Sequence, residues 1–598
     1  MPKGEKTGYN RFLLLVAGLG GLLYGIDVGI IAGALPYLEA TSGLNSGQLS
    51  IVVAAVLLGS VISTLFAGLL ADWMGRRLLM ALSGALFVIS IPVIALAQGY
   101  QPLVLGRLLQ GVSAGLIGVV VPLYLAECLS AESRGKGTGI FQWLLTLGIV
   151  AAAVVGMFFS IRVDQVAKLG DPARLFAFKD LAWRSIFWVS LPPGILFVIG
   201  SVMVAESPRW LFRCGKKDAA LLALLRSRDQ KQAELELAEM EQAAAAEKAN
   251  RSTGSKVKES LLRRKYVIPF VLACVILAFN QATGVNSIIG YNANILLQSG
   301  LSDVQAHWGY VLFTIVNFLM TMGGVALVDR KGRKFLLMVG TAGIIVSLLG
   351  TGFLFHRTEK LRIDARNAVQ SMIGRDQALT LRYDGKTANN LVSDTLGPSD
   401  KNILAQPTSM VVIYSCGDFR AASKAVRSDD EAAKRIEITR EGCLPANRVV
   451  AFFSNPFSNL ERSREAPLRI ENALITPVPG TKNGWIVAVT LFVFMAFYAV
   501  GPGVCVWLAL SELMPTRIRS NGMSIALLLN QAVSTGIAAV FLPTVGKYGY
   551  STMFFGFAAC TVIYFITAAF FLPETKGKTL EEIEAHFEGA GRAGVVTG

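Results

Sequence analysis

The stretch "ADWMGRR" at residues 71–77 places an Asp and two Arg between two long apolar runs, and "VDRKGRK" at residues 328–334 nearly repeats it. The apolar runs on either side are long enough for helices that cross a membrane, which needs roughly 20 apolar residues. Because the same charged loop returns in the second half of the chain, the sequence predicts two parallel halves of similar build.

The composition supports a membrane protein, because 53% of the 598 residues are hydrophobic and only 16% are charged. Soluble domains carry about 25% charged residues. The runs are continuous, which argues against a transmembrane β-barrel, and the first is too long for a signal peptide. We expect twelve spans, at residues 11–38, 46–71, 77–97, 102–127, 138–160, 184–205, 266–298, 306–328, 334–355, 484–512, 520–545 and 551–572.

The net charge of +15 is explained by membrane topology. Lys and Arg gather in the loops after even-numbered spans, whereas loops 39–47, 98–101 and 299–305 contain neither residue. The positive-inside rule therefore places both termini in the cytoplasm. No nucleic-acid partner is expected. With no eukaryotic targeting signal in the chain, we expect a multi-pass protein of a bacterial inner membrane.

Polar segments divide the chain further. The segment after the sixth span is rich in Ala, Glu, Lys and Leu and should be helical. A long polar insert holds Cys416 and Cys443, which an oxidising compartment would allow to form a disulfide; the alternative is two unlinked thiols. The expected parts are an N-terminal bundle (1–205), a cytoplasmic helical linker (206–265), a C-terminal bundle (266–355 and 484–572), an extracytoplasmic insert (356–483) and a cytoplasmic tail (573–598).

Several motifs occur in order at the ends of the predicted helices. They are "GRLLQG" at 106–111, "PLYLAE" at 122–127, "RGKGTG" at 134–139, "ESPRWL" at 206–211, "NQATGVN" at 280–286, "GPGVCVW" at 501–507, "SELMPTRIRSNG" at 511–522 and "PETKGKTLEEIE" at 573–584. With the two charged loops, they make the chain resemble the sugar porter family of the major facilitator superfamily. The resemblance implies an all-α membrane protein of twelve transmembrane helices in two six-helix bundles. It does not cover the insert.

The charged loops have two interpretations. Asp72 can pair with Arg76 across the turn, and Asp329 with Arg333 repeats the arrangement. The resemblance implies cytoplasmic networks that hold the two halves together in the outward-facing state and break on opening. The alternative is topogenic charges in solvated loops, where ion pairs contribute about 0–1 kcal/mol. The remaining members of the expected networks are Glu127, Arg134, Glu206 and Arg209 in the first, and Glu512, Arg517 and Arg519 in the second.

Asp27 lies well inside the first apolar run, in "LLYGIDVGIIAGAL". A carboxylate there costs about 2.5–3.5 kcal/mol on insertion scales, so it requires a partner, a proton or a water-filled cavity. Arg107, at the start of the fourth run, is the candidate partner. In proton-coupled sugar porters the matching Asp and Arg form the coupling pair; the alternative is a static ion pair.

Uncharged amides within the spans form a candidate substrate site. Amides donate to and accept from sugar hydroxyls without adding charge, although each could instead bond a neighbouring helix. The sequence departs from the family with Asn280–Gln281 in place of paired Gln, Gly290 before Tyr291, and Gln531 in place of Trp, which leaves the sugar open. The candidates are Gln142, Asn280, Gln281, Asn286, Tyr291, Asn317, Trp507, Asn530 and Gln531.

Other chemistries lack their motifs. The chain has no P-loop, which argues against an ATP-driven pump, and its three His are widely separated, which argues against a metal site. We expect no enzyme activity and no cofactor. The sequence predicts a secondary transporter that imports a sugar or polyol, with a proton as coupling ion. A facilitative uniporter, a sugar sensor whose transport is vestigial, and a drug exporter are the alternatives.

Overall fold

The computed structural model describes residues 3–129, 131–252, 263–374, 377–396, 406–429, 435–445, 448, 451, 458–514, 519–575 and 586–587. Within these ranges, only the backbone is described for residues 3–7, 131–139, 243–252, 329, 396, 507–512, 519–521 and 524.

Twelve spans in the described residues are long and apolar enough to cross a membrane, and they confirm the predicted fold class. The first half has five single helices and a sixth span made of two. These are α1 (Lys3–Thr41), α2 (Ser46–Met74), α3 (Arg76–Ala95), α4 (Tyr100–Cys128), α5 (Ala131–Ala167), α6 (Pro172–Trp188) and α7 (Leu191–Met203).

In the second half, the seventh and tenth spans are interrupted at glycines. Gly284 has φ +82°, and the ring of Phe557 lies 2.4 Å from where its Cβ would be, so only glycine fits this break. The helices are α11 (Arg264–Ala282), α12 (Val285–Gly290), α13 (Asn292–Gln298), α14 (Asp303–Lys331), α15 (Arg333–Glu359), α21 (Thr481–Val500), α22 (Pro502–Leu513), α23 (Arg519–Tyr548), α24 (Tyr550–Ile566) and the π-helical turn η1 (Thr567–Phe571).

The sixth span begins at Pro172, twelve residues before the predicted start at residue 184. Asp171 caps this helix by accepting hydrogen bonds from the backbone N–H groups of Ala173 and Arg174. The hydropathy pattern missed the first turns because they carry charged side chains, although the buried Leu175 and Trp183 belong to a hydrophobic core that both halves share.

Close backbone contacts hold the helices of the first half together. A Cβ on Gly25 would lie 1.9 Å from the carbonyl oxygen of Leu145, and one on Gly111 would lie 2.0 Å from that of Val56. These glycines let α1 approach α5 and α4 approach α2, as small residues do where membrane helices pack.

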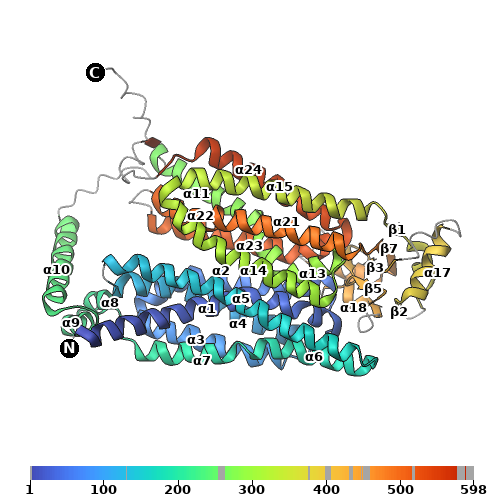
Figure 1. The fold of residues 1–598 in the computed structure, drawn as a ribbon, viewed down its shortest axis with the longest axis horizontal. Helices are drawn as coiled ribbons and strands as arrows, with labels where there is room; N and C mark the ends of the chain where they lie inside the picture. Colours follow the sequence, from blue (N-terminus) through green and yellow to red (C-terminus); the bar gives the residue numbers. More distant parts are fainter. Residues whose placement is uncertain are drawn as a thin grey trace, which may run out of the picture.

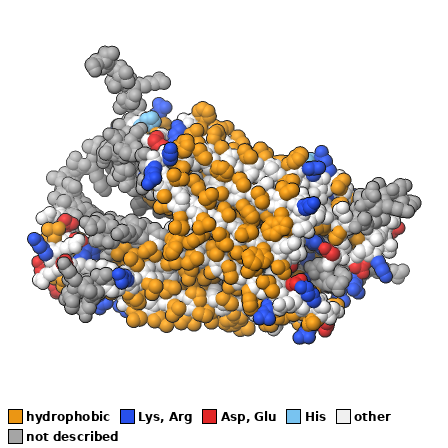
Figure 2. All heavy atoms as spheres, viewed as in Figure 1, with side chains coloured by type: hydrophobic (Ala, Val, Ile, Leu, Met, Phe, Trp, Pro, Cys, Tyr) orange, Lys and Arg blue, Asp and Glu red, His pale blue; other side chains and the backbone are white. Residues whose placement is uncertain are grey.

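The two halves lie side by side with their helices roughly parallel to one long axis (Figure 1). Apolar side chains cover the middle of the visible face, and charged ones gather at its ends (Figure 2), as expected for a bilayer-embedded surface. One end carries three linker helices, α8 (Pro208–Arg213), α9 (Lys217–Ser227) and α10 (Gln230–Ser252). The opposite end carries the insert.

The insert is a folded β-rich unit. Its larger sheet has the strand order β1-β7-β3-β4, with β5 also paired to β3, and β2 pairs with β6 separately; every pairing is antiparallel. The strands are β1 (Ile363–Asp364), β2 (Leu379–Arg382), β3 (Thr408–Cys416), β4 (Phe419–Ala422), β5 (Val426–Arg427), β6 (Arg435–Ile438) and β7 (Leu468–Pro477), and the helices are α16 (Arg366–Ser371), α17 (Gly385–Leu396), α18 (Arg440–Cys443) and α20 (Leu460–Glu465).

The insert has a hydrophobic core of its own, separate from those of the bundles. Ile470 and Ile475 of β7, which lie on either side of an irregularity in its pairing with β3, are both buried in this core together with Met410 and Val412 of β3. A unit with its own core buries enough apolar surface to hold a fixed shape at the end of the bundle.

Candidate functional site

Four polar side chains meet where the broken seventh span packs against α23. Gln281 Nε2 donates to Asn530 Oδ1 at 3.2 Å, and Asn286 Nδ2 donates to Gln281 Oε1 at 2.9 Å. Asn286 Nδ2 also donates to Ser534 Oγ at 2.8 Å. The break after α11 turns Asn286 back toward Gln281, which puts several donors and acceptors on one uncharged surface.

Asn280 and Tyr291, which flank this cluster, differ in how many of their polar atoms form hydrogen bonds. Asn280 is buried, and its Oδ1 accepts no hydrogen bond, while its Nδ2 lies 3.5 Å from the hydroxyl of Tyr498. Tyr291 instead donates to the carbonyl oxygen of Ala538 at 3.2 Å and stacks on Phe541 with 4.5 Å between ring centroids. Asn280 thus keeps an unfilled acceptor, whereas Tyr291 is engaged in packing.

The other predicted substrate residues lie on facing helices. Gln142 of α5 and Asn317 of α14 directly precede Trp143 and Phe318 in the chain, and the ring centroids of these two aromatic residues lie 5.6 Å apart where the helices meet. Gln531 lies within hydrogen-bonding reach of Tyr24 across the two halves. The side chain of Trp507 lies outside the described residues. The structure therefore groups Gln281, Asn286 and Asn530 tightly and places Gln142, Asn317 and Gln531 at the seam between the halves.

Asp27 and Arg107 are two buried charges of the first half, with 1% and 2% of their side chains exposed. Arg107 Nη1 lies 3.6 Å from Asp27 Oδ1, beyond a good hydrogen bond. The same Nη1 donates to Gln110 Oε1 at 2.7 Å, and neither oxygen of Asp27 has a hydrogen-bond partner. Gln110 was missed by the sequence analysis, although it follows Arg107 by one helical turn.

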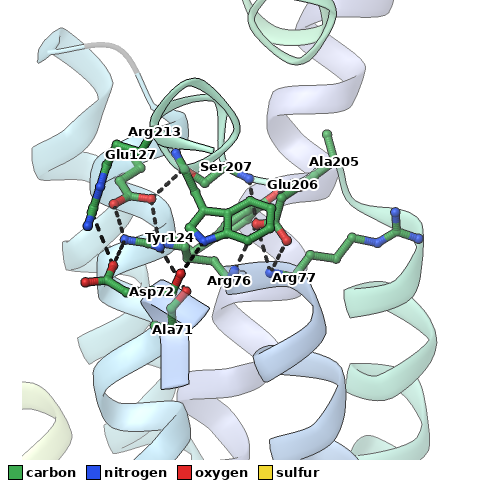
Figure 3. A network of polar contacts seen from close by, with 11 residues as sticks. Ala71, Asp72, Arg76, Arg77, Tyr124, Glu127, Ala205, Glu206, Ser207 and Arg213 are labelled. Carbon is green, nitrogen blue, oxygen red and sulfur yellow. Dashed lines mark hydrogen bonds and ion pairs between the residues drawn. The ribbon is translucent and has the colours of Figure 1, made fainter. Parts of the chain in front are cut away.

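Glu206 caps the helix that begins at the first charged loop (Figure 3). Its carboxylate accepts from the backbone N–H of Arg76 at 2.9 Å and of Arg77 at 3.1 Å. A helix N-terminus favours a negative charge. Gly75 has φ +92°, and a Cβ there would lie 2.4 Å from Glu206 Oε2, so glycine permits both the turn and the cap.

Arg76 joins the second and fourth spans to this loop (Figure 3). Its guanidinium lies 2.9 Å from Asp72 Oδ1 and 2.9 Å from Glu127 Oε2, and only 2% of the side chain is exposed. Ser207 donates a short hydrogen bond to Glu127. These contacts satisfy a nearly buried cation with two carboxylates, so the cluster is more than a set of solvated loop charges.

Arg209 was predicted to complete this cluster in the outward-facing state, and that role stays a prediction. Its side chain is exposed, and Arg213, one turn further on, lies 3.2 Å from Asp72 instead. The turn of α8 explains the difference, because Ser207 caps this helix and aims Trp210 and Arg213 toward Asp72.

The second charged loop repeats the cap. Glu574 accepts from the backbone N–H of Arg333 at 3.1 Å and of Lys334 at 3.2 Å, and Gly332 has φ +90°. Glu574 was missed as a site residue, although its motif "PETKG" parallels "ESPRW". The side chains of Arg134, Asp329, Glu512, Arg517 and Arg519 lie outside the described residues.

The two halves are joined by polar contacts near the end that carries the insert. Asp303 of α14 accepts hydrogen bonds from Tyr37 of α1 and Ser160 of α5, each at 2.7 Å. His307 stacks on Tyr37 with 5.6 Å between ring centroids, and its Nε2 lies 3.2 Å from the carbonyl oxygen of Gly33.

Further contacts nearby bring the insert into this closure. Asn294 donates to Glu39 at 2.6 Å across the halves. Asn45, the N-cap of α2, donates to the carbonyl oxygen of Gly442 in the insert at 2.7 Å, while Arg427 of the insert donates to the carbonyl oxygen of Leu297 at 2.6 Å. The insert is thus bonded to both halves. The recorded ion pairs of Arg76, by contrast, stay within one half.

Cys416 and Cys443 lie together in the insert as thiols. The neighbouring Cys443 thiol lowers the pKa of the Cys416 thiol by donating a hydrogen bond to it. Cys443 also contacts the carbonyl oxygen of Phe419 at 3.2 Å. Their disulfide stays a prediction, and the structure satisfies its basic requirement, the adjacency of the two sulfur atoms.

Twelve spans in two six-helix halves, with paired charged loops and an uncharged amide cluster between helices, define a secondary transporter of the major facilitator class. The family model "Sugar (and other) transporter" matches residues 13–372 and 472–587. The chain belongs to the sugar porter family of this superfamily and is a transporter, not an enzyme. The stretch between the two matched ranges, residues 373–471, lies within the insert.

Individual relatives agree over nearly the whole chain. The glucose transporter GlcP of Staphylococcus epidermidis is 27% identical over 96% of this chain and 97% of its own length. The proton myo-inositol cotransporter of Homo sapiens is 27% identical over 98% of this chain and 83% of its own. The solved structure of the xylose transporter XylE of E. coli in a partially occluded inward-open conformation matches the fold with a TM-score of 0.62 at 19% identity, covering 96% of this chain and 100% of its own.

Proposed function

We propose that this protein imports a neutral sugar or polyol together with a proton, by alternating access of a central site between the two halves. The observation that carries the proposal is the Asp27 carboxylate. It is buried in a membrane helix without a hydrogen-bond donor, 3.6 Å from Arg107, which donates to Gln110. A charged carboxylate so placed is costly, so it favours a bound proton or a closer cation.

The coupling step follows from the competition between Asp27 and Gln110 for Arg107. With Asp27 charged, Arg107 is attracted toward α1 and holds α1 against α4. With Asp27 protonated, the attraction is lost, and Arg107 keeps its short hydrogen bond to Gln110 within α4. Each protonation state thus favours a different packing of α1 on α4, as a coupled two-state transporter requires.

The amide cluster is the proposed sugar site. Gln281, Asn286 and Asn530 bond one another, so a sugar hydroxyl can replace one amide bond by another of similar strength. Asn280 adds an acceptor that nothing fills. A site without charge favours neutral polyols, and the relatives' names include glucose, xylose and myo-inositol transporters.

The orientation follows from charge and contacts. We place the loops rich in Lys and Arg, the linker and both termini in the cytoplasm of a cell membrane, and the insert outside. The structure, closed at the insert's end, is then inward-facing. The network around Arg76 would join the halves in the outward-facing state.

Uptake into liposomes tests the substrate assignment. Purified protein is reconstituted, and counterflow of labelled glucose, xylose and myo-inositol is measured for the wild type, Gln281→Ala and Gln101→Ala. Gln101 is an exposed amide at the start of α4 and serves as the control. We expect at least one sugar to be transported, with a loss of tenfold or more only in Gln281→Ala. Transport unaffected by Gln281→Ala would overturn the central site.

A further inference from the structure

A cavity of about 770 Å³ lies beneath the insert, away from the amide cluster. Three parts of the chain line it. The first half contributes the end of α1 (Pro36–Ala40), the end of α5 and the start of α6, and the second half contributes the segment from Asn294 to Gln305. The insert covers the cavity with residues between Gln406 and Asp429. Its volume falls within the roughly 300–1,000 Å³ of small-molecule sites.

The charged groups of this lining nearly cancel. It holds four carboxylates and three cations, so no single sign dominates. Several are already paired: Arg427 lies 2.7 Å from Asp429, and Asp303 accepts two hydrogen bonds. Such a lining favours a neutral ligand with many hydroxyls over an anion or a cation. The acidic residues are Glu39, Asp164, Asp303 and Asp429, and the basic ones are Lys179, Lys424 and Arg427.

An unsatisfied amide marks where a ligand would bind. Asn294 lines the cavity and has only 7% of its surface exposed. Its Nδ2 donates to Glu39 at 2.6 Å, but its Oδ1 accepts no hydrogen bond. A buried acceptor without a donor costs about 1–3 kcal/mol, which a ligand hydroxyl would recover. Gln298, one turn later on α13, adds a second amide on the same face.

We propose that this cavity is a second sugar- or polyol-binding site, formed by the insert together with both halves and separate from the central site. The proposal rests on the proposed function, because it assigns the same class of ligand. The walls come from three parts, so the complete site exists only while the insert and the halves are in contact. A sugar bound there therefore stabilises the state closed at the insert's end.

This linkage predicts substrate inhibition. After releasing its cargo, the transporter must reopen at the insert's end, which separates the walls of the cavity. High external sugar occupies the cavity and slows this step. Uptake should therefore rise and then fall as the external concentration increases.

Equilibrium binding on the purified full chain tests the second site. The probes are labelled glucose, xylose and myo-inositol, taken to saturation. Ala425→Trp fills the cavity from the insert, and Ser393→Trp places the same side chain on the exposed face of α17 as a control. We expect two sugars per wild-type chain. Gln281→Ala should keep one, and adding Ala425→Trp should weaken that one at least tenfold, whereas adding Ser393→Trp should not.

The outcomes separate the two proposals. A wild type that binds at most one sugar, with that binding lost in Gln281→Ala and unchanged in Ala425→Trp, overturns the second site and leaves the central site standing. Binding and transport that Gln281→Ala does not change would refute the central site instead. Substrate inhibition is the second readout: it should disappear in Ala425→Trp and persist in Ser393→Trp, and its persistence in Ala425→Trp overturns the second site.

Discussion

Replacing Tyr37 by Phe should open the transporter at the insert's end. Tyr37 is 1% exposed, and its hydroxyl donates to Asp303 at 2.7 Å across the two halves. A hydrogen bond to a charged group contributes about 1.5–3 kcal/mol. Opening at this end breaks the Tyr37–Asp303 hydrogen bond and exposes both groups to water. The wild type therefore loses the free energy of this bond when it opens, whereas Tyr37→Phe has no such bond to lose.

The shift can be given as a ratio. About 1.4 kcal/mol is a factor of ten, so Tyr37→Phe should raise the ratio of outward- to inward-facing molecules by about ten- to a hundredfold. Asp303 keeps the hydrogen bond from Ser160, so the variant should still close. Stacking on His307 is also retained by the phenyl ring.

Pulsed electron spin resonance measures this shift. Nitroxides at Lys168 and Lys482, on the insert-end termini of the two halves, report their separation in a Cys214→Ser background. Tyr124→Phe is the matched control, because it removes a 2.6 Å hydrogen bond to Ala205 within one half. A longer-distance population that grows in Tyr37→Phe but not in Tyr124→Phe is expected. Equal distance distributions in both variants and the wild type would refute the reasoning.

Three further predictions concern stability. Arg76→Ala removes a nearly buried cation from two carboxylates and should lower the unfolding free energy by about 3–5 kcal/mol, whereas Arg209→Ala should change it little; thermal melting of both variants checks this. Gly111→Ala should lower the unfolding free energy by about 1–3 kcal/mol, because the new methyl group clashes with the backbone of Val56. Gly68→Ala should leave the unfolding free energy unchanged, because no atom lies within 4 Å of the new methyl group. Oxidised protein should carry a Cys416–Cys443 disulfide in peptide maps, and its reduction should lower the insert's stability by about 3–4 kcal/mol.

Much of the membrane fold follows from hydropathy, because a span must be apolar over nearly its whole length. The paired charges Asp72 and Arg76 could be predicted for the same reason, since charges within an apolar chain stand out. The caps by Glu206 and Glu574 could not, because they depend on the approach of distant segments to Gly75 and Gly332.

The contacts that join the two halves at the end carrying the insert also could not be predicted from the sequence. Asp303 occupies the first turn of α14, where an acidic residue is common for local reasons. Its role as an acceptor for Tyr37 and Ser160 appears only once α1, α5 and α14 are packed. The strands of the insert left a clearer signal, because "TSMVVIYSC" at 408–416 is rich in β-branched residues that favour strands.

The central claim is that Asp27 couples one proton to each sugar, and accumulation against a gradient tests it most directly. Asp27 is the only carboxylate placed at mid-span among the described helices, so one proton per cycle is expected. An inward gradient of about two pH units is then worth about 2.7 kcal/mol, or a hundredfold accumulation. Wild-type liposomes and the control Asp394→Asn, which changes an exposed carboxylate on α17, should approach this ratio, whereas Asp27→Asn should exchange sugar but stop at equilibrium. Accumulation by Asp27→Asn, or none by the wild type, would contradict the account.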